Sequence, residues 1–187
     1  MKSRHSNSLV LVWRVAEFEA RHLNAPAIEP EHLLLGLCKV VDLELTELVP
    51  KDLPNRDEVL EEVLREVRKL RAIFRDAGLD ARIFRRRLRR AAPERRFSVA
   101  ESERLRRSPA ARQVFAEAER CAQLGGATVF PVHLLFATLL AEDPHRDATL
   151  AEIKVDKEQL VSLARSAVLT PQPDSASASE KARTRWN

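Results

Sequence analysis

Apolar residues recur at every third or fourth position through most of the chain, which is the spacing of amphipathic helices. The first such stretch runs from about residue 8 to 23. A second begins at Pro30, and proline suits the first turn of a helix because its missing N–H would have no partner there. A third begins near Asp57 and ends at Gly78, and a fourth follows Asp80, which is able to cap it. The pattern predicts four helices in the first half of the chain.

The second half repeats this order of elements. A helix capped by Ser108 is followed by one that begins at Pro131, by a short one near residues 149–153, and by a last one after Asp156, where Gln159 is expected to complete a capping box. The motif of the second helix returns after 101 residues: Pro30, His32, Leu33 and Leu34 recur as Pro131, His133, Leu134 and Leu135. A repeat of this length indicates one structural unit used twice around a shared core. We predict an all-α fold of about eight helices, built from two pseudo-symmetric four-helix repeats.

The repeats divide the chain into a domain and a tail. The first repeat covers about residues 6–91, a charged linker 92–107, and the second repeat about 108–169, so that one domain spans 6–169. The first copy carries extra residues within 39–66, which should lengthen its third helix. Residues 170–187, rich in Pro, Ser and Ala, are expected to be disordered.

Composition narrows the class of protein. Apolar residues make up 44% and charged residues 32% of the 187, as in globular proteins. Four glycines leave no phosphate-binding loop, so we expect no ATP hydrolysis. Cys38 and Cys121 have neither metal nor redox spacing and are expected to be buried. No signal peptide and no membrane-length apolar run is visible, so we expect a cytoplasmic protein without membrane contact. We also expect a monomer that binds neither a cofactor nor a metal.

Positive charge is concentrated in residues 82–107, which contain eleven arginines. Three interpretations stay open: a solvated helix face, a surface for an acidic protein, or a surface for nucleic acid. The segment offers only Phe84 and Phe97 for stacking on bases, which makes nucleic acid the weakest of the three. The residues predicted to form a basic patch are Arg85, Arg86, Arg89, Arg90, Arg95 and Arg96.

The two histidines of the motif raise the question of catalysis or metal binding. Either role would need His32 and His133 to converge with a third group, and equivalent residues of a repeat are more often structural, here bonded to backbone near the turn. Glu31 should lie exposed in a first helical turn, where the helix dipole favours an acid. Glu61 and Glu62 are expected on exposed faces. With no nucleophile beside a base, we predict a protein that is not an enzyme.

The repeated motif resembles that of the Clp N-terminal domain, the paired-repeat helical domain at the front of the Clp ATPases. Glu31–Leu37 is close to the family's Glu-His-Leu-Leu-Leu-Gly-Leu, and Leu79–Asp80 and Val155–Asp156 resemble the family's Val-Asp at the start of each last helix. The likeness covers about residues 6–168 and is weaker in the second motif, where Val132 replaces the glutamate.

The resemblance implies a docking module that presents adaptors or substrate proteins to a Clp ATPase and its protease. Some members bind phosphorylated arginine through the glutamate before each histidine. Glu31 matches that position and Val132 does not, so at most one such site is implied. The residues predicted to bind protein or a phosphoarginine-like ligand are Pro30, Glu31, His32, Pro131 and His133. The alternative is a basic, nucleic-acid-associated or regulatory protein that acts through the segment from Arg82 to Arg107.

Overall fold

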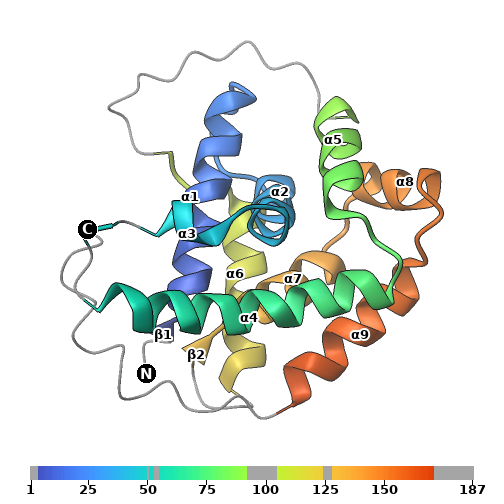
Figure 1. Ribbon diagram of the computed structural model, residues 1–187. Coiled ribbons are helices and arrows are strands. Elements are labelled where there is room, and N and C mark those ends of the chain that lie inside the picture. Colours follow the sequence, from blue (N-terminus) through green and yellow to red (C-terminus); the bar gives the residue numbers. More distant parts are fainter. Residues whose placement is uncertain (1–3, 50, 53–54, 92–104, 124–127, 171–187) are drawn as a thin grey trace.

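The structure is a computed structural model that describes residues 4–49, 51–52, 55–91, 105–123 and 128–170. It confirms an all-α fold of about eight helices: within the described residues there are eight helices of nine residues or more, one helix of four residues and one pair of two-residue strands (Figure 1). In chain order these elements are β1 (Arg4–His5), α1 (Asn7–His22), α2 (Pro30–Asp42), α3 (Leu45–Leu48), α4 (Arg56–Asp76), α5 (Ala81–Ala91), α6 (Pro109–Gln123), β2 (Thr128–Val129), α7 (Pro131–Leu140), α8 (Pro144–Glu152) and α9 (Lys157–Leu169).

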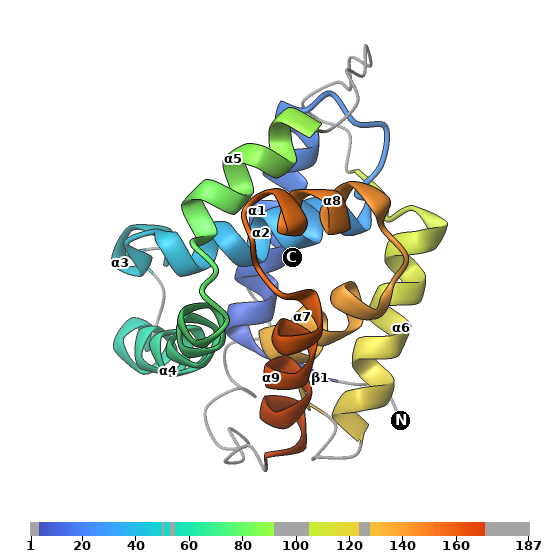
Figure 2. The same ribbon diagram turned by 90° about the vertical axis from the view of Figure 1, so that its right-hand side faces the viewer.

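The helices that begin at the repeated motif form the centre of the molecule. α2 and α7 pack against each other, and each also packs against the first helix of its own half. α7 is buried on every side, since nine of its ten residues are buried. In two views at right angles, α5 and α8 lie side by side at one end and α9 lies along α7 (Figures 1 and 2). A helix that is apolar all round needs such a complete covering.

The extra residues of the first half form α3 and lengthen the third long helix. α4 has 21 residues, whereas α8, its counterpart in the second half, has 9. This confirms the predicted lengthening. α4 crosses the lower part of the molecule in Figure 1 and contacts both halves, because it packs on α1 and α2 and also on α7 and α9.

Short parallel pairings join the two halves in a symmetric way. Arg4 and His5 pair with Thr128 and Val129, and the N–H of Ser6 donates to the carbonyl of Val129 at 3.0 Å. The second pairing has the same form: Ile28 bridges Arg107, and the N–H of Ser108 donates to the carbonyl of Ile28 at 3.0 Å. In each case the segment before the first helix of one half pairs with the segment before the motif of the other half. Residues 105–107, assigned to the linker from the sequence, are therefore part of the folded structure.

Serines at equivalent positions cap the first helices of the two halves. The hydroxyl of Ser6 accepts the N–H of Leu9 at 3.3 Å, and the hydroxyl of Ser108 accepts the N–H of Ala111 at 3.1 Å. Each serine therefore satisfies an N–H that has no partner inside the helix. The cap at Ser108 was predicted, and the one at Ser6 places the start of α1 at Asn7, one residue before the expected start.

The turns before the last helix of each half also share one geometry. Gly78 and Lys154 both have a left-handed backbone, with φ of 68° and 59°. Behind them the N–H of Leu79 donates to the carbonyl of Phe74 at 2.7 Å, and that of Val155 to the carbonyl of Leu150 at 3.0 Å. Each pattern ends one helix with a residue in the left-handed region.

Aspartates cap the helices that follow these turns. The carboxylate of Asp80 accepts two backbone N–H groups of α5, and that of Asp156 accepts two of α9. The capping box predicted for Gln159 is wrong. Its side-chain amide donates instead to the carbonyl of Asp76 at 3.2 Å, because the end of α4 lies within reach and offers an unpaired carbonyl.

Several predictions concern residues that the structure does not describe. Arg95, Arg96, the linker from 92 to 104, the glycines at 125 and 126, and the expected tail from 171 onward all lie outside the described residues. Among the helices that are described, none combines the length and the apolar character that a membrane span requires.

Candidate functional site

Both histidines of the repeated motif bind the backbone of their own turn. The N–H of Glu29 donates to Nδ1 of His32, and the N–H of Phe130 donates to Nδ1 of His133, each at 2.9 Å. Both imidazoles are buried. Each ring thus satisfies an N–H at a helix start, as predicted for a structural histidine. Burial, together with the charge of Lys69, lowers the pKa of His133 to about 4, so this ring is neutral near pH 7.

Glu31 is much less exposed than the sequence suggested. Its side chain is only 13% exposed, and its Oε1 lies 3.7 Å from Nε2 of His32. Because Nδ1 of His32 accepts a hydrogen bond, Nε2 carries the hydrogen that faces this carboxylate. The expectation of a fully exposed glutamate is wrong, since the side chain folds back over its own histidine. A partner would reach the edge of Glu31, beside the half-buried Pro30.

The second motif presents a different surface. Pro131 and Val132 are both buried, and the ring of Phe130 lies 5.8 Å from the imidazole of His133. No carboxylate stands before this histidine, because Val132 takes the place that Glu31 has in the first copy. The predicted binding residues therefore fall into two groups. At the start of α2, Pro30 and Glu31 are partly exposed beside the buried His32, whereas at the start of α7 Pro131 and His133 are both buried.

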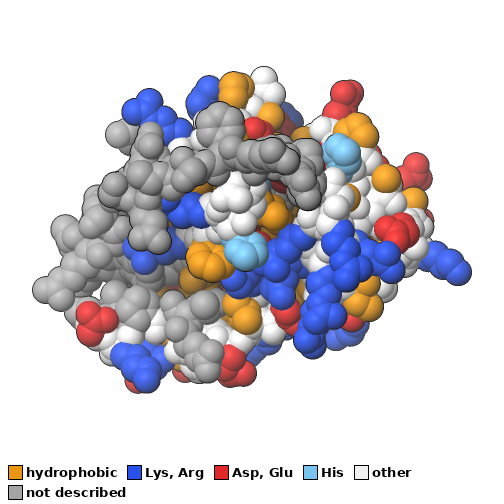
Figure 3. All heavy atoms as spheres, turned by 90° about the horizontal axis from the view of Figure 1, so that it is seen from above, with side chains coloured by type: hydrophobic (Ala, Val, Ile, Leu, Met, Phe, Trp, Pro, Cys, Tyr) orange, Lys and Arg blue, Asp and Glu red, His pale blue; other side chains and the backbone are white. Residues whose placement is uncertain are grey.

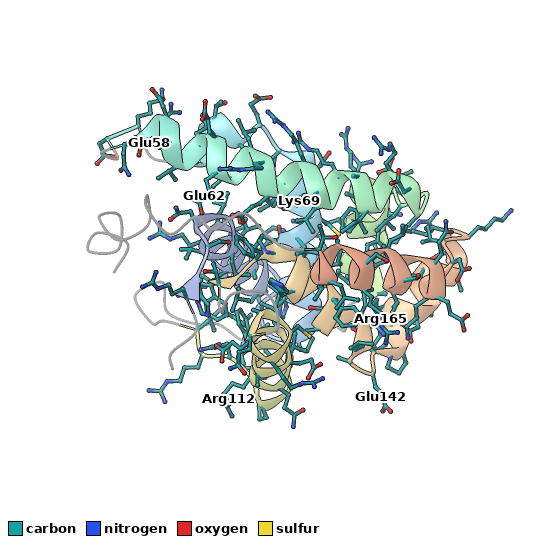
Figure 4. All side chains as sticks on the ribbon, turned by 90° about the horizontal axis from the view of Figure 1, so that it is seen from below. Glu58, Glu62, Lys69, Arg112, Glu142 and Arg165 are labelled. Carbon is teal, nitrogen blue, oxygen red and sulfur yellow. The ribbon has the colours of Figure 1, made fainter. Side chains whose placement is uncertain are left out.

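Of the two glutamates that were expected on exposed faces, one is buried. Glu61 is exposed, but Glu62 is 5% exposed, and Glu66 one turn further is also buried. Glu62 accepts a hydrogen bond from the side chain of Asn7 at 2.9 Å, and Glu66 accepts the hydroxyls of Ser6 and Ser8. The prediction was wrong for Glu62 because it rested on charge alone. Glu62 and Glu66 are four residues apart, and each follows a buried valine by three residues, so both share the inward face of α4. Figure 4 shows Glu62 and Lys69 on the side of α4 that faces the other helices.

The buried carboxylates join α4 to the first turn of α1. Burial raises the pKa of Glu66 to about 7, against the opposing effect of the hydrogen bonds from Ser8 and Ser6. Ser8 and Glu66 have no contact with a histidine that would make the serine a nucleophile, and both are buried away from solvent. The arrangement is that of a structural hydrogen-bond cluster.

The cysteines are buried, as predicted. Cys38 and Cys121 are both free, and burial raises the pKa of Cys38 to about 12, which keeps it protonated and unreactive. Within the described ranges, no three His, Cys, Asp or Glu side chains gather in a way that would hold a metal ion.

The six arginines of α5, four of which belong to the predicted basic patch, form two sets. Arg85 pairs with Asp42 of α2 at 3.2 Å, and Arg87 pairs with Glu152 of α8 at 2.5 Å. Arg89 forms a bidentate pair with Glu19 of α1, at 2.8 and 2.5 Å. These three arginines fasten α5 to three other helices. Arg86 and Arg90, together with Arg82, point to solvent and form no ion pair with any residue that the structure describes.

Among the described residues, each half contains one charged side chain that is completely buried. In the first half this is Glu19, which is 0% exposed and lies between Arg89 and Lys39, the latter at 3.4 Å. In the second half it is Arg146, also 0% exposed, which donates to the carbonyl of Thr138 at 2.5 Å and to Asp147 at 2.7 Å. The two ion pairs differ in the exposure of their carboxylates. Glu19 is completely buried, whereas Asp147 is 37% exposed and also binds Lys157.

A pocket of about 250 Å³ lies between the first helices of the two halves. Trp13 of α1 and Phe115 of α6 meet edge to face in its wall, with ring centroids 5.6 Å apart. The guanidinium carbon of Arg107 lies 5.4 Å from the Trp13 ring and 4.7 Å from the Phe115 ring. The remaining lining residues are His5, Leu9 and Val10.

Only part of this pocket could be predicted from the sequence. Leu9 and Trp13 belong to the apolar stripe predicted for the first helix, and Phe115 belongs to the stripe of its counterpart. Nothing in the spacing indicated that the two stripes would leave a gap where they meet. The position of Arg107 follows from its pairing with Ile28, and no local pattern in the sequence predicts this pairing.

The chain was compared with families and with individual proteins. It matches no protein-family model, and no curated protein matches it.

Proposed function

We propose that this chain is a non-enzymatic protein-interaction module, which docks substrates or adaptors for a Clp-type ATP-dependent protease or chaperone. In this proposal it acts as a monomer in the cytoplasm. The observation that carries it is the pocket between α1 and α6, because a concave surface with an aromatic wall and one cation is suited to anchoring a side chain of a protein. The likeness of its repeated motif to the Clp N-terminal domain supplies the identity of the partners.

The distribution of perturbed groups supports binding rather than catalysis. The groups with the largest pKa changes are Glu66, His133 and Cys38, and all three are buried in the packing between helices. None of them lines the pocket, whose titratable residues are His5 and Arg107. Active sites present such groups to a substrate in a cleft, so the burial of these three outside the lining of the pocket favours an interaction module.

The docking surface in this proposal has two parts. One is the aromatic pocket, which provides apolar contact. The other is the edge of Glu31 beside Pro30, which provides the carboxylate that a cationic or phosphoarginine-like ligand would engage. The buried turn of Pro131 and His133 shapes the core and leaves the second copy without an equivalent carboxylate.

The test is affinity capture from the lysate of the native host with the tagged full chain, at low and moderate salt, read by mass spectrometry. We expect Clp ATPase or protease subunits, or a defined set of clients, that persist at moderate salt. Glu31→Ala and Val10→Asp, which alter the two parts of the surface, should each reduce this recovery. Glu58→Ala is the matched control, because Glu58 also stands in the first turn of a helix, α4, but is exposed and belongs to neither part of the docking surface.

The alternative function makes a different prediction in the same experiment. Binding to phosphates through several arginines weakens steeply between low and moderate salt. Recovery of ribosomal or DNA-bound material alone, washed off by salt and unchanged in Glu31→Ala and Val10→Asp, would contradict the docking module. It would instead favour the nucleic-acid-associated protein.

A further inference from the structure

Helix α5 carries its arginines in two sets with different surroundings. Arg85, Arg87 and Arg89 are held by carboxylates of α2, α8 and α1. The other three, Arg82, Arg86 and Arg90, are exposed, and the described part of the chain offers none of them a carboxylate. We call these three residues the arginine stripe. Seen from above, Lys and Arg side chains gather in a broad patch on the face where α5 lies (Figure 3).

The stripe has a regular spacing. Its members are four residues apart, so they lie on one face of α5, about 6 Å from one to the next along the helix axis. Ile83 follows Arg82 and lies three residues before Arg86, so its side chain borders the stripe. Ile83 is 48% exposed, although it is a large apolar residue. The surface thus combines evenly spaced cations with one apolar contact.

The helix that presents the stripe is firmly held. Phe84 and Leu88 bury their side chains in the core, and the three paired arginines tie α5 to three neighbouring helices. A surface fixed in this way loses little conformational freedom when a partner binds. No carboxylate of the described residues pairs with these three guanidinium groups, and their mutual repulsion is unfavourable. A negatively charged partner would relieve this repulsion.

We propose that the arginine stripe and Ile83 form a docking surface for an acidic helical segment of a partner protein. A helix with Glu or Asp at every fourth position repeats its charges at the same interval of about 6 Å, so each carboxylate meets one guanidinium. An apolar side chain on that helix would cover Ile83. Nucleic acid fits less well, because the one aromatic residue of α5, Phe84, is buried and cannot stack on a base.

This docking surface is separate from the one in the proposed function. The pocket is lined by residues of the first half of α1 and by Phe115 of α6, and Glu31 lies in the first turn of α2. The stripe belongs to α5, which meets α1 near Glu19. Failure of either proposal leaves the other standing, since the variants for one do not alter the other surface.

The test uses the full chain and a labelled, alanine-based peptide of about 20 residues, long enough to form a helix, with glutamate at every fourth position and one leucine between them. Binding is followed by fluorescence anisotropy at low salt. The variant Arg82→Gln, Arg86→Gln, Arg90→Gln should weaken binding about tenfold, as expected for the loss of three exposed ion pairs. The control Arg65→Gln, Arg68→Gln, Arg75→Gln removes the same charge from exposed positions of α4 and should leave binding unchanged.

A charge swap provides the second measurement. The variant Arg82→Glu, Arg86→Glu, Arg90→Glu should lose the glutamate peptide and gain a peptide with lysine in place of glutamate. All of these positions are exposed, so circular dichroism should show every variant folded. Equal weakening in the α5 and α4 variants would overturn the proposal, because only net charge would then matter. Tighter binding of oligothymidylate than of the glutamate peptide by the native chain would overturn it in favour of nucleic acid.

Discussion

In the first copy of the repeat the motif turn carries Glu31 before its histidine, and in the second copy Val132 stands at the same place. The contacts that build the fold are the same in both copies: a serine cap, a parallel pairing to the other copy, a histidine bonded to its own turn, and an aspartate cap on the last helix. What differs is the length of the third helix and what each motif turn exposes. The comparison indicates that the shared residues maintain the structure and that any specialised binding belongs to the residues that differ.

The largest expected difference between the halves concerns their buried charges. Arg89→Met should destabilise the protein by about 3 kcal/mol, because Glu19 would stay fully buried with Lys39 as its remaining partner. Arg146→Met should lower stability by about 1 kcal/mol, because Asp147 keeps Lys157 and contact with water. Urea unfolding of the two variants measures the difference, and equal losses would contradict this account of the two sites.

The pH dependence of stability should differ in sign between Glu66 and His133. The folded pKa of Glu66 is about 7 and lies above its ordinary value of 4.5, so its contribution to stability falls as the pH rises from 4.5 to 7. The folded pKa of His133 is about 4 and lies below 6.5, so its contribution falls as the pH drops from 6.5 to 4. Each effect amounts to about 3 kcal/mol across its window.

Because these two windows overlap, the effects oppose each other in the native chain. Glu66→Gln should leave a protein that loses stability on acidification toward pH 4. His133→Asn, whose amide oxygen is able to accept the N–H of Phe130, should leave one that loses stability as the pH approaches 7. Unfolding free energies measured from pH 4 to 7.5 test both, and parallel curves for the two variants would rule out this assignment.

The motif glycine lies where α1 and α2 approach each other closely. A Cβ at Gly36 would lie 2.7 Å from the carbonyl oxygen of Val12, which belongs to the backbone and cannot move away alone. Gly36→Ala should therefore destabilise the protein by about 2 kcal/mol, whereas Ala137→Gly in the second motif should lower stability by about 1 kcal/mol through helix propensity. Thermal melts of both variants measure this, and a neutral Gly36→Ala would mean that α1 and α2 are able to separate.

The smallest effect is expected in the turns before the last helices. Gly78 and Lys154 share a left-handed backbone, which glycine adopts without strain and lysine does not. Lys154→Gly should stabilise the protein by up to about 1 kcal/mol, and Gly78→Lys should destabilise it by a similar amount. The shifts in melting temperature should have opposite signs, and the same sign for both would show that side-chain contacts outweigh the backbone.

The sequence predicted most of the helices because their signals are local. Four helices begin within a residue or two of the starts that local signals predict, at Pro30, Asp80, Ser108 and Asp156. The apolar spacing along each helix identifies its inward face. The sequence did not predict contacts that depend on distant parts of the chain. The burial of Glu62, the pairing of Arg107 with Ile28 and the contact of Gln159 with Asp76 all need the second half or the insertion to be in place.

The candidate sites divide in the same way. The structural role of the histidines followed from their equivalent positions in the repeat. The difference between paired and unpaired arginines on α5 did not, because Asp42, Glu152 and Glu19 come from three helices far apart in sequence. The aromatic pocket exists only where the first helices of the two halves meet, so neither half alone contains its pattern.

The two crossed pairings have a consequence for how the chain is divided. Each half lends the segment before its first helix to the other half and receives the same in return, at Val129 and at Ile28. Such an exchange between equivalent surfaces is the arrangement of a two-fold symmetric homodimer. A polypeptide ending after the first half would therefore lack the segment that pairs with Ile28. It would also carry the equivalent segment, Arg4–His5, without the strand with which it pairs. Two such polypeptides would each supply the segment that the other lacks, whereas the full chain carries both exchanged segments in one polypeptide.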